Sequence, residues 1–243
     1  MKGVILAAGL GRRLGKLTAE KPKTLLQVGS RPLISHILRS LSSCGVRDVI
    51  IVTGHGDRKL REVVGDGSRF NTSVVYINNP HYATTNNSYS LNLVRDAVSG
   101  SFLIVNSDVF FHPGILRKLV RSPVRGIVLM VDVDKVLGEE EMKVSADGDR
   151  ITDIGKGLRP EKAFGEYIGM AKIDASSVRL FFAALEEVLE ELGTGVFYEE
   201  AFRRLIESGV PVRYTTTGGL PWIEIDTPED LEEAEMEIAP GIN

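Results

Sequence analysis

The sequence has few of the features that define several classes of protein. Its 243 residues contain one cysteine, Cys44, so no disulfide can form within the chain. A single thiol fits a reducing compartment, and we interpret Cys44 as a small buried hydrophobic residue rather than a catalytic thiol. We therefore expect a cytoplasmic protein.

Long apolar runs and an excess of positive charge are also missing from the sequence. No apolar run reaches the ~20 residues that a membrane span requires. The short run at the N-terminus leads directly into Gly-Leu-Gly-Arg-Arg, which argues against a signal peptide. The net charge of −4 argues against general binding of polyanions. We expect neither a membrane span nor a nucleic-acid partner.

Short apolar runs alternate with helix-like segments as far as about residue 131. Strands are predicted at 2–7, 48–53, 73–77, 101–106 and 126–131, and helices near 31–44, 56–65, 87–97 and 113–121. Several of these strands are continuous and β-branched, as in strands buried on both faces of a parallel sheet. The alternation predicts an α/β fold with a doubly wound, mostly parallel sheet. Pro32 suits the first turn of the first helix.

The pattern changes after residue 131. Asp147-Gly148-Asp149 separates two short strand-like segments and predicts a β-hairpin. Further strands are predicted at 166–173, 212–216 and 222–225, and helices near 175–192, 197–208 and 228–238. The last helix has Thr227 at its N-cap position and Asp230 at its third position. We expect a single domain over 1–243, with the hairpin region as a small β-rich insert over the carboxyl edge of the sheet.

The stretch from Met1 to Val28 carries the strongest chemical signal. A buried strand runs at once into a glycine-rich loop, which is how α/β proteins present backbone N–H groups to phosphates. Gly9 and Gly11 allow the backbone to approach a ligand closely. The cationic side chains of the stretch include Arg12, Arg13, Lys21 and Lys23. Since guanidinium and ammonium groups bind phosphate oxygens, the stretch predicts a phosphate site.

Two aspartates follow predicted strands. Asp108 comes after the apolar run 102–105, and Asp226 comes after the strand 222–225. Ligands of open α/β sheets bind at the carboxyl ends of the strands, and a carboxylate beside a phosphate suits Mg²⁺. The alternative for each residue is a structural role at the start of a helix, before Pro113 for Asp108 and beside Thr227 for Asp226.

Amides and lysines supply further candidate contacts. The run 78–91 is rich in asparagine, whose amide can read the hydrogen-bonding edge of a base, although Asn86 or Asn87 could instead cap the next helix. After residue 131, lysines on strands or turns could reach a ligand or simply be solvated at the surface. These lysines are Lys143, Lys156 and Lys172.

The N-terminal stretch resembles the signature of the sugar-phosphate nucleotidyltransferase family, which has a Rossmann-like nucleotidyltransferase fold. The residues that carry the resemblance are Leu6 to Leu14 and Glu20 to Leu25. Asn106-Ser107-Asp108 matches the metal-binding aspartate motif of the family, and 222–231 matches its second aspartate motif. The loop is not a Walker A sequence, because the Gly-Lys-[Ser/Thr] ending is missing.

The run Asn87-Ser88-Tyr89-Ser90-Leu91 resembles the cytidylyltransferase branch of the family. This branch includes enzymes that act on choline phosphate and on inositol 1-phosphate. Gly155-Lys156-Gly157 stands where the hexose-1-phosphate enzymes have Glu-Lys-Pro. A single tryptophan and a lysine-bearing insert suit an anionic, polyhydroxylated acceptor better than a quaternary ammonium, which needs an aromatic box. The chain therefore most resembles the inositol-1-phosphate enzymes.

The resemblance implies a reaction in which inositol 1-phosphate attacks the α-phosphorus of CTP with the help of Mg²⁺, giving CDP-inositol and pyrophosphate. It implies catalytic roles for Arg13, Lys23 and Asp108, and nucleotide contacts from Leu6, Ala7, Ala8, Gly9, Gly11, Asn87 and Ser90. It implies acceptor contacts from Lys143, Lys156, Glu166 and Lys172, and metal binding by Asp108 and Asp226. Residues 1–131 would then form the nucleotide-binding half and 132–243 the acceptor-binding half.

Three other functions stay open at this point. Two are transfer to choline phosphate and transfer to a hexose 1-phosphate. The third is a catalytically silent domain that senses a nucleotide, because folds of this type also serve as regulatory subunits. The expected partners are CTP and a small phosphorylated acceptor, and a second copy of the chain is a further candidate.

Overall fold

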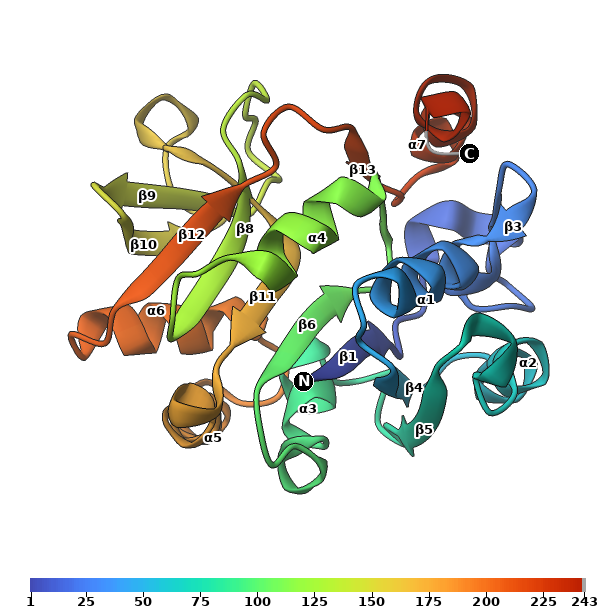
Figure 1. The fold of residues 1–243 in the computed structure, drawn as a ribbon, viewed down its shortest axis with the longest axis horizontal. Coiled ribbons are helices and arrows are strands. Elements are labelled where there is room, and N and C mark those ends of the chain that lie inside the picture. The colour runs from blue at the N-terminus through green and yellow to red at the C-terminus, as the bar shows by residue number, and fades with distance from the viewer. Residues whose placement is uncertain (242–243) are drawn as a thin grey trace.

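The computed structural model describes residues 1–241 and is organised around the apolar N-terminal strand, β1 (Lys2–Ala7). Ile5 of this strand lies between Ile51 and Val105 of its two parallel neighbours. Five of the six residues in β1 are buried, because both faces of the sheet are covered by helices. The continuous apolar run that predicted this strand thus reflects its central position (Figure 1).

The main sheet has nine strands in the order β5-β4-β1-β6-β11-β8-β12-β10-β9. In chain order after β1 they are β4 (Asp48–Thr53), β5 (Ser73–Asn78), β6 (Phe102–Asn106), β8 (Ile127–Asp132), β9 (Lys143–Asp147), β10 (Arg150–Gly155), β11 (Gly165–Ile173) and β12 (Val212–Thr216). The strands β5, β4, β1 and β6 are parallel. The predicted α/β fold with a doubly wound, mostly parallel sheet is confirmed.

The strand β11 lies in the middle of the sheet and runs antiparallel to both of its neighbours, β6 and β8. Its first residues therefore lie at the carboxyl edge of β6, and its last residues lie at the amino edge. Its position along the sequence was predicted, but its place in the centre of the sheet was not. The hairpin β9–β10 was predicted as an insert over the carboxyl edge. Its strands join the main sheet: β10 pairs with β12, and β9 pairs with the first residues of β11 at that edge.

Helices form a layer on each face of the sheet (Figure 1). One face packs against α1 (Leu33–Ser43) and α4 (Pro113–Arg121), and the other against α3 (Asn87–Asn92), α5 (Val178–Leu192) and α6 (Glu199–Glu207). The remaining helices are α2 (Asp57–Val64) and α7 (Pro228–Glu233), which continues as a π-helix over Ala234–Ile238. None of the helices described within residues 1–241 is long and apolar enough to cross a membrane.

Two short sheets lie beside the main sheet. One pairs β2 (Gln27–Val28) with β3 (Arg31–Pro32), and the other pairs β7 (Val109–Phe111) with β13 (Trp222–Glu224). Pro32 was predicted in the first turn of α1, but its ψ of 146° is extended and the residue pairs in β3. The helix predicted over 87–97 was also too long, because α3 ends at Asn92.

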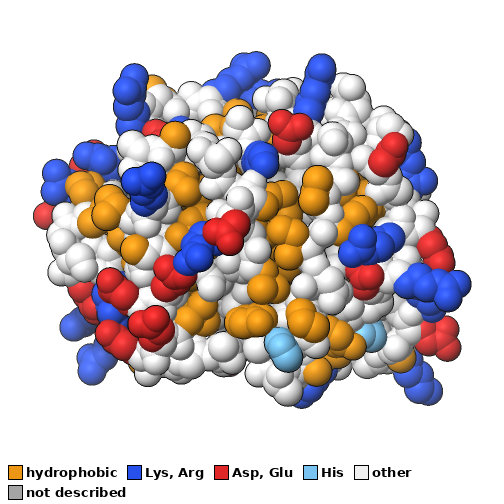
Figure 2. All heavy atoms as spheres, turned by 90° about the horizontal axis from the view of Figure 1, so that it is seen from below, with side chains coloured by type: hydrophobic (Ala, Val, Ile, Leu, Met, Phe, Trp, Pro, Cys, Tyr) orange, Lys and Arg blue, Asp and Glu red, His pale blue; other side chains and the backbone are white. Residues whose placement is uncertain are grey.

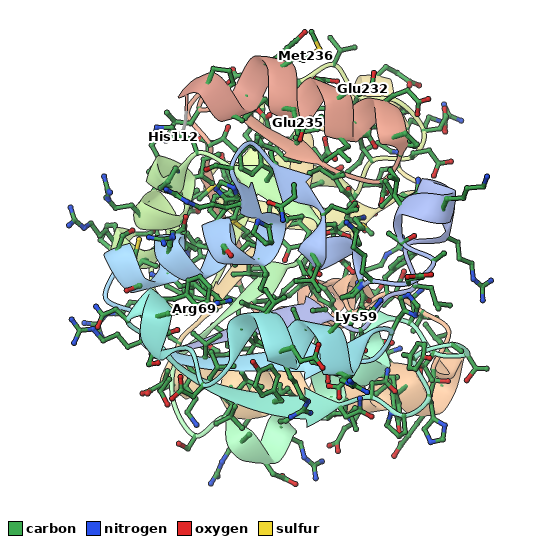
Figure 3. All side chains as sticks on the ribbon, turned by 90° about the vertical axis from the view of Figure 1, so that its right-hand side faces the viewer. Lys59, Arg69, His112, Glu232, Glu235 and Met236 are labelled. Carbon is green, nitrogen blue, oxygen red and sulfur yellow. The ribbon has the colours of Figure 1, made fainter. Side chains whose placement is uncertain are left out.

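The C-terminal helix packs on the same core as α1. Figure 3 shows it across the top of that side, with Glu232, Glu235 and Met236 on its exposed surface. Its buried side chains, Ala234 and Ile238, belong to the core cluster that also contains α1. The packing fixes the segment that comes just before the helix, which carries Asp226.

One face of the molecule carries apolar side chains among charged ones. Figure 2 shows this face, which lies over α5, α3 and β5. Val75 of β5 and Leu180 of α5 are among the exposed large hydrophobic residues. A surface of this kind can contact another protein, and the homodimer stays a prediction.

Cys44 is half-buried at the end of α1 rather than fully buried.

Candidate active site

A cleft of about 370 Å³ opens at the carboxyl ends of β1 and β6. Its walls come from the loop after β1, from the asparagine-rich segment after β5, and from residues that follow β6 and β13. The opposite wall comes from the start of β11, the start of α6 and the segments around 140 and 156. Of the predicted site residues, the lining includes Leu6, Ala7, Ala8, Gly9, Gly11, Arg13, Lys23, Asn87, Ser90, Asp108, Lys156 and Asp226.

The shape of the loop after β1 is fixed by the contact between Gly11 and Thr18. Gly11 has a φ of 60°, in the left-handed region that glycine adopts without strain. A Cβ atom at this position would lie 3.2 Å from Thr18 Cγ2. The Thr18 hydroxyl in turn donates a hydrogen bond to the Gly11 carbonyl at 2.8 Å. The loop is therefore closed on its protein side and open toward the cleft at Gly9, where a Cβ would meet nothing within 4 Å.

Three carboxylates meet at one end of the cleft. Asp108, Glu224 and Asp226 each offer an oxygen, and these oxygens lie within 4.8 Å of one another. The β7–β13 pairing brings them together, because Glu224 lies opposite Val109 and the Ile225 N–H donates to the Asp108 carbonyl at 2.9 Å. Among residues 1–241, Asp108 Oδ1 is buried and has no hydrogen-bond partner. This donor set fits a divalent cation that prefers oxygen ligands.

Two cations from the N-terminal stretch neutralise these carboxylates. Lys23 Nζ lies 3.2 Å from Asp108 Oδ2 and also forms an ion pair with Asp226 Oδ1, and Arg13 pairs with Asp226 Oδ2. The Lys23 side chain is only 10% exposed. Burial alone would lower the pKa of Lys23, but the charges of Asp108 and Asp226 raise it above its ordinary value. Lys23 is thus held as a cation at the carboxylate cluster.

Glu224 was not predicted as a site residue. Glu224 is an exposed residue, yet desolvation of its carboxylate within the cleft and the negative charges of Asp108 and Asp226 raise its pKa to about 8. The spacing could have identified it, because residues two apart on a strand point to the same face. Glu224 and Asp226 have that spacing.

Neither aspartate serves as a helix cap. Thr227 caps α7 in a capping box, accepting from the Asp230 N–H while Asp230 Oδ2 accepts from the Thr227 N–H at 2.7 Å. This cap was predicted, and it leaves the Asp226 carboxylate to the cleft. His112 caps α4 by accepting from the Gly114 N–H at 3.0 Å. The cap roles considered for Asp108 and Asp226 are therefore excluded.

The asparagine-rich segment forms a hydrogen-bonded wall of the cleft. Asn86 caps α3 by accepting from the Asn87 N–H, and Asn87 Oδ1 accepts from the Tyr198 N–H at 2.9 Å. The buried Asn79 side chain donates to Ser90 Oγ at 3.0 Å. These bonds explain the dense run of amides in physical terms. They order the segment so that Asn87 and Ser90 line the cleft.

The opposite wall carries a lysine and a buried glutamate. Lys156 Nζ lies 3.7 Å from Glu140 Oε2 and 5.5 Å from the centre of the Phe197 ring. Glu199 begins α6, lines the cleft and is 5% exposed. Burial raises the pKa of Glu199 to about 7. Sequence reasoning missed Glu199, since nothing in the sequence around it marks it as a site residue.

Three residues predicted to contact the acceptor do not line the cleft among the residues described. The Lys143 ammonium is fully buried and donates to the carbonyls of Gly138, Glu139 and Glu141, so it fixes a loop. Glu166 is buried against Lys135, with Oε2 2.9 Å from Nζ.

Lys172 lies at the amino edge of the sheet, where it donates to the Ser122 carbonyl at 2.7 Å. The antiparallel direction of β11 takes it away from the cleft. The prediction that these three residues reach the pocket is corrected accordingly.

Comparison with known proteins agrees with this geometry. Residues 3–142 match the family model of the MobA-like NTP transferase domain. The chain belongs to this family.

The chain is 32% identical to CMP-5'-(3-aminopropyl)phosphonate synthase of Streptomyces rubellomurinus, over 99% of this chain and 39% of that protein. It is 33% identical to the bifunctional IPC transferase and DIPP synthase of Aquifex aeolicus, over 95% of this chain and 50% of that protein. The chain thus spans half or less of the length of these curated relatives.

The fold is similar to that of the inositol-1-phosphate CTP transferase from T. maritima. The TM-score is 0.79 at 22% identity, with 98% of this chain and 97% of that chain covered. The predicted resemblance to sugar-phosphate nucleotidyltransferases of the cytidylyltransferase type is confirmed.

Proposed function

We propose that this domain transfers a cytidylyl group from CTP to a small acceptor carrying a phosphate or phosphonate, and releases pyrophosphate. An acceptor oxygen forms a bond to the α-phosphorus. The bond from that phosphorus to the oxygen bridging to the β-phosphorus breaks, and its electron pair leaves with pyrophosphate. The observation that carries the proposal is the meeting of Asp108, Glu224 and Asp226 with Lys23 and Arg13, beside the loop after β1.

Each part of this cluster has a role in the proposed reaction. The backbone from Leu6 to Gly11 and the Arg13 guanidinium hold the β- and γ-phosphates. Lys23 lies between the α-phosphate and the incoming acceptor, and neutralises the charge that both bring. The phosphate or phosphonate dianion is already a nucleophile at neutral pH, so the reaction needs positioning and charge neutralisation more than a general base.

Asp108, Glu224 and Asp226 are the residues that would hold a divalent cation, and Mg²⁺ suits their oxygens. When bound, such a cation supplies positive charge to the α-phosphate oxygens. Asn87 and Ser90 face the space for the cytosine and ribose. These roles rest on the geometry of the cleft and on the resemblance to the family.

Among acceptors, inositol 1-phosphate is the first candidate. The similarity to the IPC transferase of Aquifex aeolicus supports it, and so does Lys156, whose ammonium can donate to hydroxyl groups. An aminoalkyl phosphonate is the second candidate. It is favoured by the similarity to the aminopropylphosphonate synthase and by the buried carboxylate of Glu199 on the acceptor wall.

An acceptor panel tests the proposal. Pyrophosphate release is measured with CTP and each of inositol 1-phosphate, choline phosphate, glucose 1-phosphate and 3-aminopropylphosphonate, and repeated with ATP, GTP and UTP. We expect release with CTP and inositol 1-phosphate. Release with CTP and another acceptor only would replace the first candidate. Binding of CTP without pyrophosphate release from any pair would favour a silent nucleotide-sensing domain.

A further inference from the structure

We propose that Glu199 is a specificity-determining residue of the acceptor site. Its carboxylate accepts a hydrogen bond from a hydroxyl or ammonium group at the end of the acceptor remote from the phosphorus. The inference rests on the proposed function and adds a recognition requirement to it. An acceptor with an apolar end would leave Glu199 Oε2 buried without a partner.

The first observation is an unsatisfied oxygen at the cleft. Glu199 Oε2 is buried and has no hydrogen-bond partner within the described part of the chain, and the residue lines the cleft. A buried polar atom without a partner costs about 1–3 kcal/mol, and more for a charged group. Such a group is rare in folded proteins unless a ligand or another bound molecule supplies the partner. Because Glu199 lines the cleft, a ligand bound there is the partner that we propose for this carboxylate.

A purely structural role at the start of α6 explains the buried carboxylate of Glu199 less well than ligand binding does. Carboxylates are favoured in the first turn of a helix, where the backbone N–H groups make the end positive. The neighbouring residue, Glu200, also lies in the first turn of α6 and is half-buried outside the cleft lining. Since Glu200 gives the helix end this charge at lower desolvation cost, the helix does not require a second, buried carboxylate.

The segment that carries Glu199 is fixed relative to the transfer site. The Tyr198 N–H donates to Asn87 of the nucleotide wall, and the Tyr198 hydroxyl donates to Asn106 Oδ1 at 3.1 Å. Asn106 ends β6, two residues before Asp108. Glu199 is thus held in a defined place with respect to both the nucleotide and the carboxylate cluster. A group fixed in this way can discriminate acceptors by length as well as by chemistry.

The same wall already accommodates a cation. The Lys156 ammonium lies over the Phe197 ring and near Glu140, and the charge of Lys156 lowers the pKa of Glu199. Aromatic faces and carboxylates together favour cationic or hydroxyl-bearing groups. An inositol ring offers hydroxyl donors to Glu199, and an aminoalkyl phosphonate offers an ammonium. Both acceptors share the chemistry that Glu199 recognises.

The test compares Glu199→Gln and Glu199→Ala with Glu200→Gln as the matched control. KM is measured for the acceptor and for CTP in separate titrations. Loss of a hydrogen bond to a charged group corresponds to about a 10- to 100-fold change, so Glu199→Ala should raise the acceptor KM by that factor. The KM for CTP should change less than about 3-fold, and Glu200→Gln should change neither value.

The Gln variant distinguishes the two acceptor classes. It keeps an oxygen that accepts from a hydroxyl but loses the charge that pairs with an ammonium. A polyol acceptor should therefore show a small rise in KM with Glu199→Gln, and an amine acceptor a rise close to that of Glu199→Ala. Thermal unfolding and CTP affinity verify that both variants fold.

An acceptor KM unchanged by Glu199→Ala would overturn the inference, as would equal increases in both KM values. If the wild-type protein turns over no member of the panel, the proposed function fails. The role of Glu199 is then decided by calorimetric titration of inositol 1-phosphate and 3-aminopropylphosphonate into the CTP-loaded protein. Binding weakened by Glu199→Ala would retain the inference. No binding, or binding equal to wild type, would overturn it.

Discussion

The two ends of the cleft hold charge in different ways. At the catalytic end, the carboxylates of Asp108 and Asp226 are paired with Lys23 and Arg13 from the N-terminal stretch. At the acceptor end, Lys156 is 40% exposed and has only a loose contact with Glu140. At the catalytic end, the charges of Asp108 and Asp226 are therefore neutralised by other side chains of the chain. At the acceptor end, the Lys156 ammonium can still form hydrogen bonds with a ligand.

The difference follows from the elements that build each end. The catalytic end is assembled from the carboxyl edge of a parallel sheet and from the β7–β13 pairing, which fix backbone positions by hydrogen bonds. The acceptor wall is assembled from loops and from the first turn of α6. In the proposed reaction, the chemistry common to all acceptors would lie on rigid strands. Recognition of one acceptor would lie on connecting segments that tolerate change.

The largest expected effect comes from breaking the catalytic end. Asp108→Ala should lower kcat by at least ~10²-fold, because it removes one preorganised charge from the proposed site of cytidylyl transfer. Initial rates of pyrophosphate release at saturating CTP measure this. Asp147→Ala, at an exposed strand end, is the control. A kcat within about 3-fold of wild type would exclude the proposed metal role of Asp108.

A second prediction uses pH at the acceptor end. Because the pKa of Glu199 in the folded protein is about 7, above its value of 4.5 in an unfolded chain, the folded state binds more protons between these values. The contribution of Glu199 to stability is then present at low pH and is lost as pH rises through 7.

Glu199→Gln should remove that dependence. In wild type, ionisation of Glu199 should lower the free energy of unfolding by about 2 kcal/mol between pH 5 and pH 8. This part of the decrease should be absent in Glu199→Gln. Urea denaturation at the two pH values measures the change. Equal pH dependence in the two proteins would show that the Glu199 carboxylate is not desolvated in solution.

A third prediction compares two lysines that the sequence did not distinguish. Lys156→Met should raise the KM for inositol 1-phosphate about 10-fold, through loss of a charged hydrogen-bond donor. Lys172→Met lies at the opposite edge of the sheet and should leave this KM unchanged. Steady-state titration of the acceptor measures both. A KM for inositol 1-phosphate within about 3-fold of wild type in Lys156→Met would exclude the proposed contact.

The smallest expected effect concerns the helix that follows Asp226. Thr227→Ala should lower the free energy of unfolding by about 1 kcal/mol, because it removes the N-cap of α7. Chemical denaturation measures the loss. A variant as stable as wild type would show that Thr227 does not cap the helix, and would reopen a cap role for Asp226.

The parallel half of the fold could be predicted closely from the sequence. The bounds of β1 and β4 agree with the predicted strands, because continuous apolar runs mark strands buried on both faces. The N-cap of α7 was also predicted, since Thr227 and Asp230 have the spacing of a capping box. The bounds of these strands and the helix cap depend on local sequence, so they could be predicted without knowledge of distant contacts.

The acceptor half depends on contacts that are distant in sequence. Periodicity does not give the direction of a strand, so nothing in 166–173 indicated that β11 runs antiparallel and takes Lys172 away from the cleft. Lys143 looked like a ligand-binding lysine until its three carbonyl partners were visible. Glu199 is marked only by its burial, which no spacing predicts.

A ³¹P NMR spectrum of wild-type protein incubated with CTP, Mg²⁺ and the acceptor panel detects cytidylyl transfer directly. We predict signals of pyrophosphate together with a new product in which cytidylyl and acceptor phosphorus share one bridging oxygen. Both signals should disappear with Asp108→Ala. CTP that remains unchanged in the presence of every acceptor, or that yields phosphate instead of pyrophosphate, would show that the domain does not transfer a cytidylyl group.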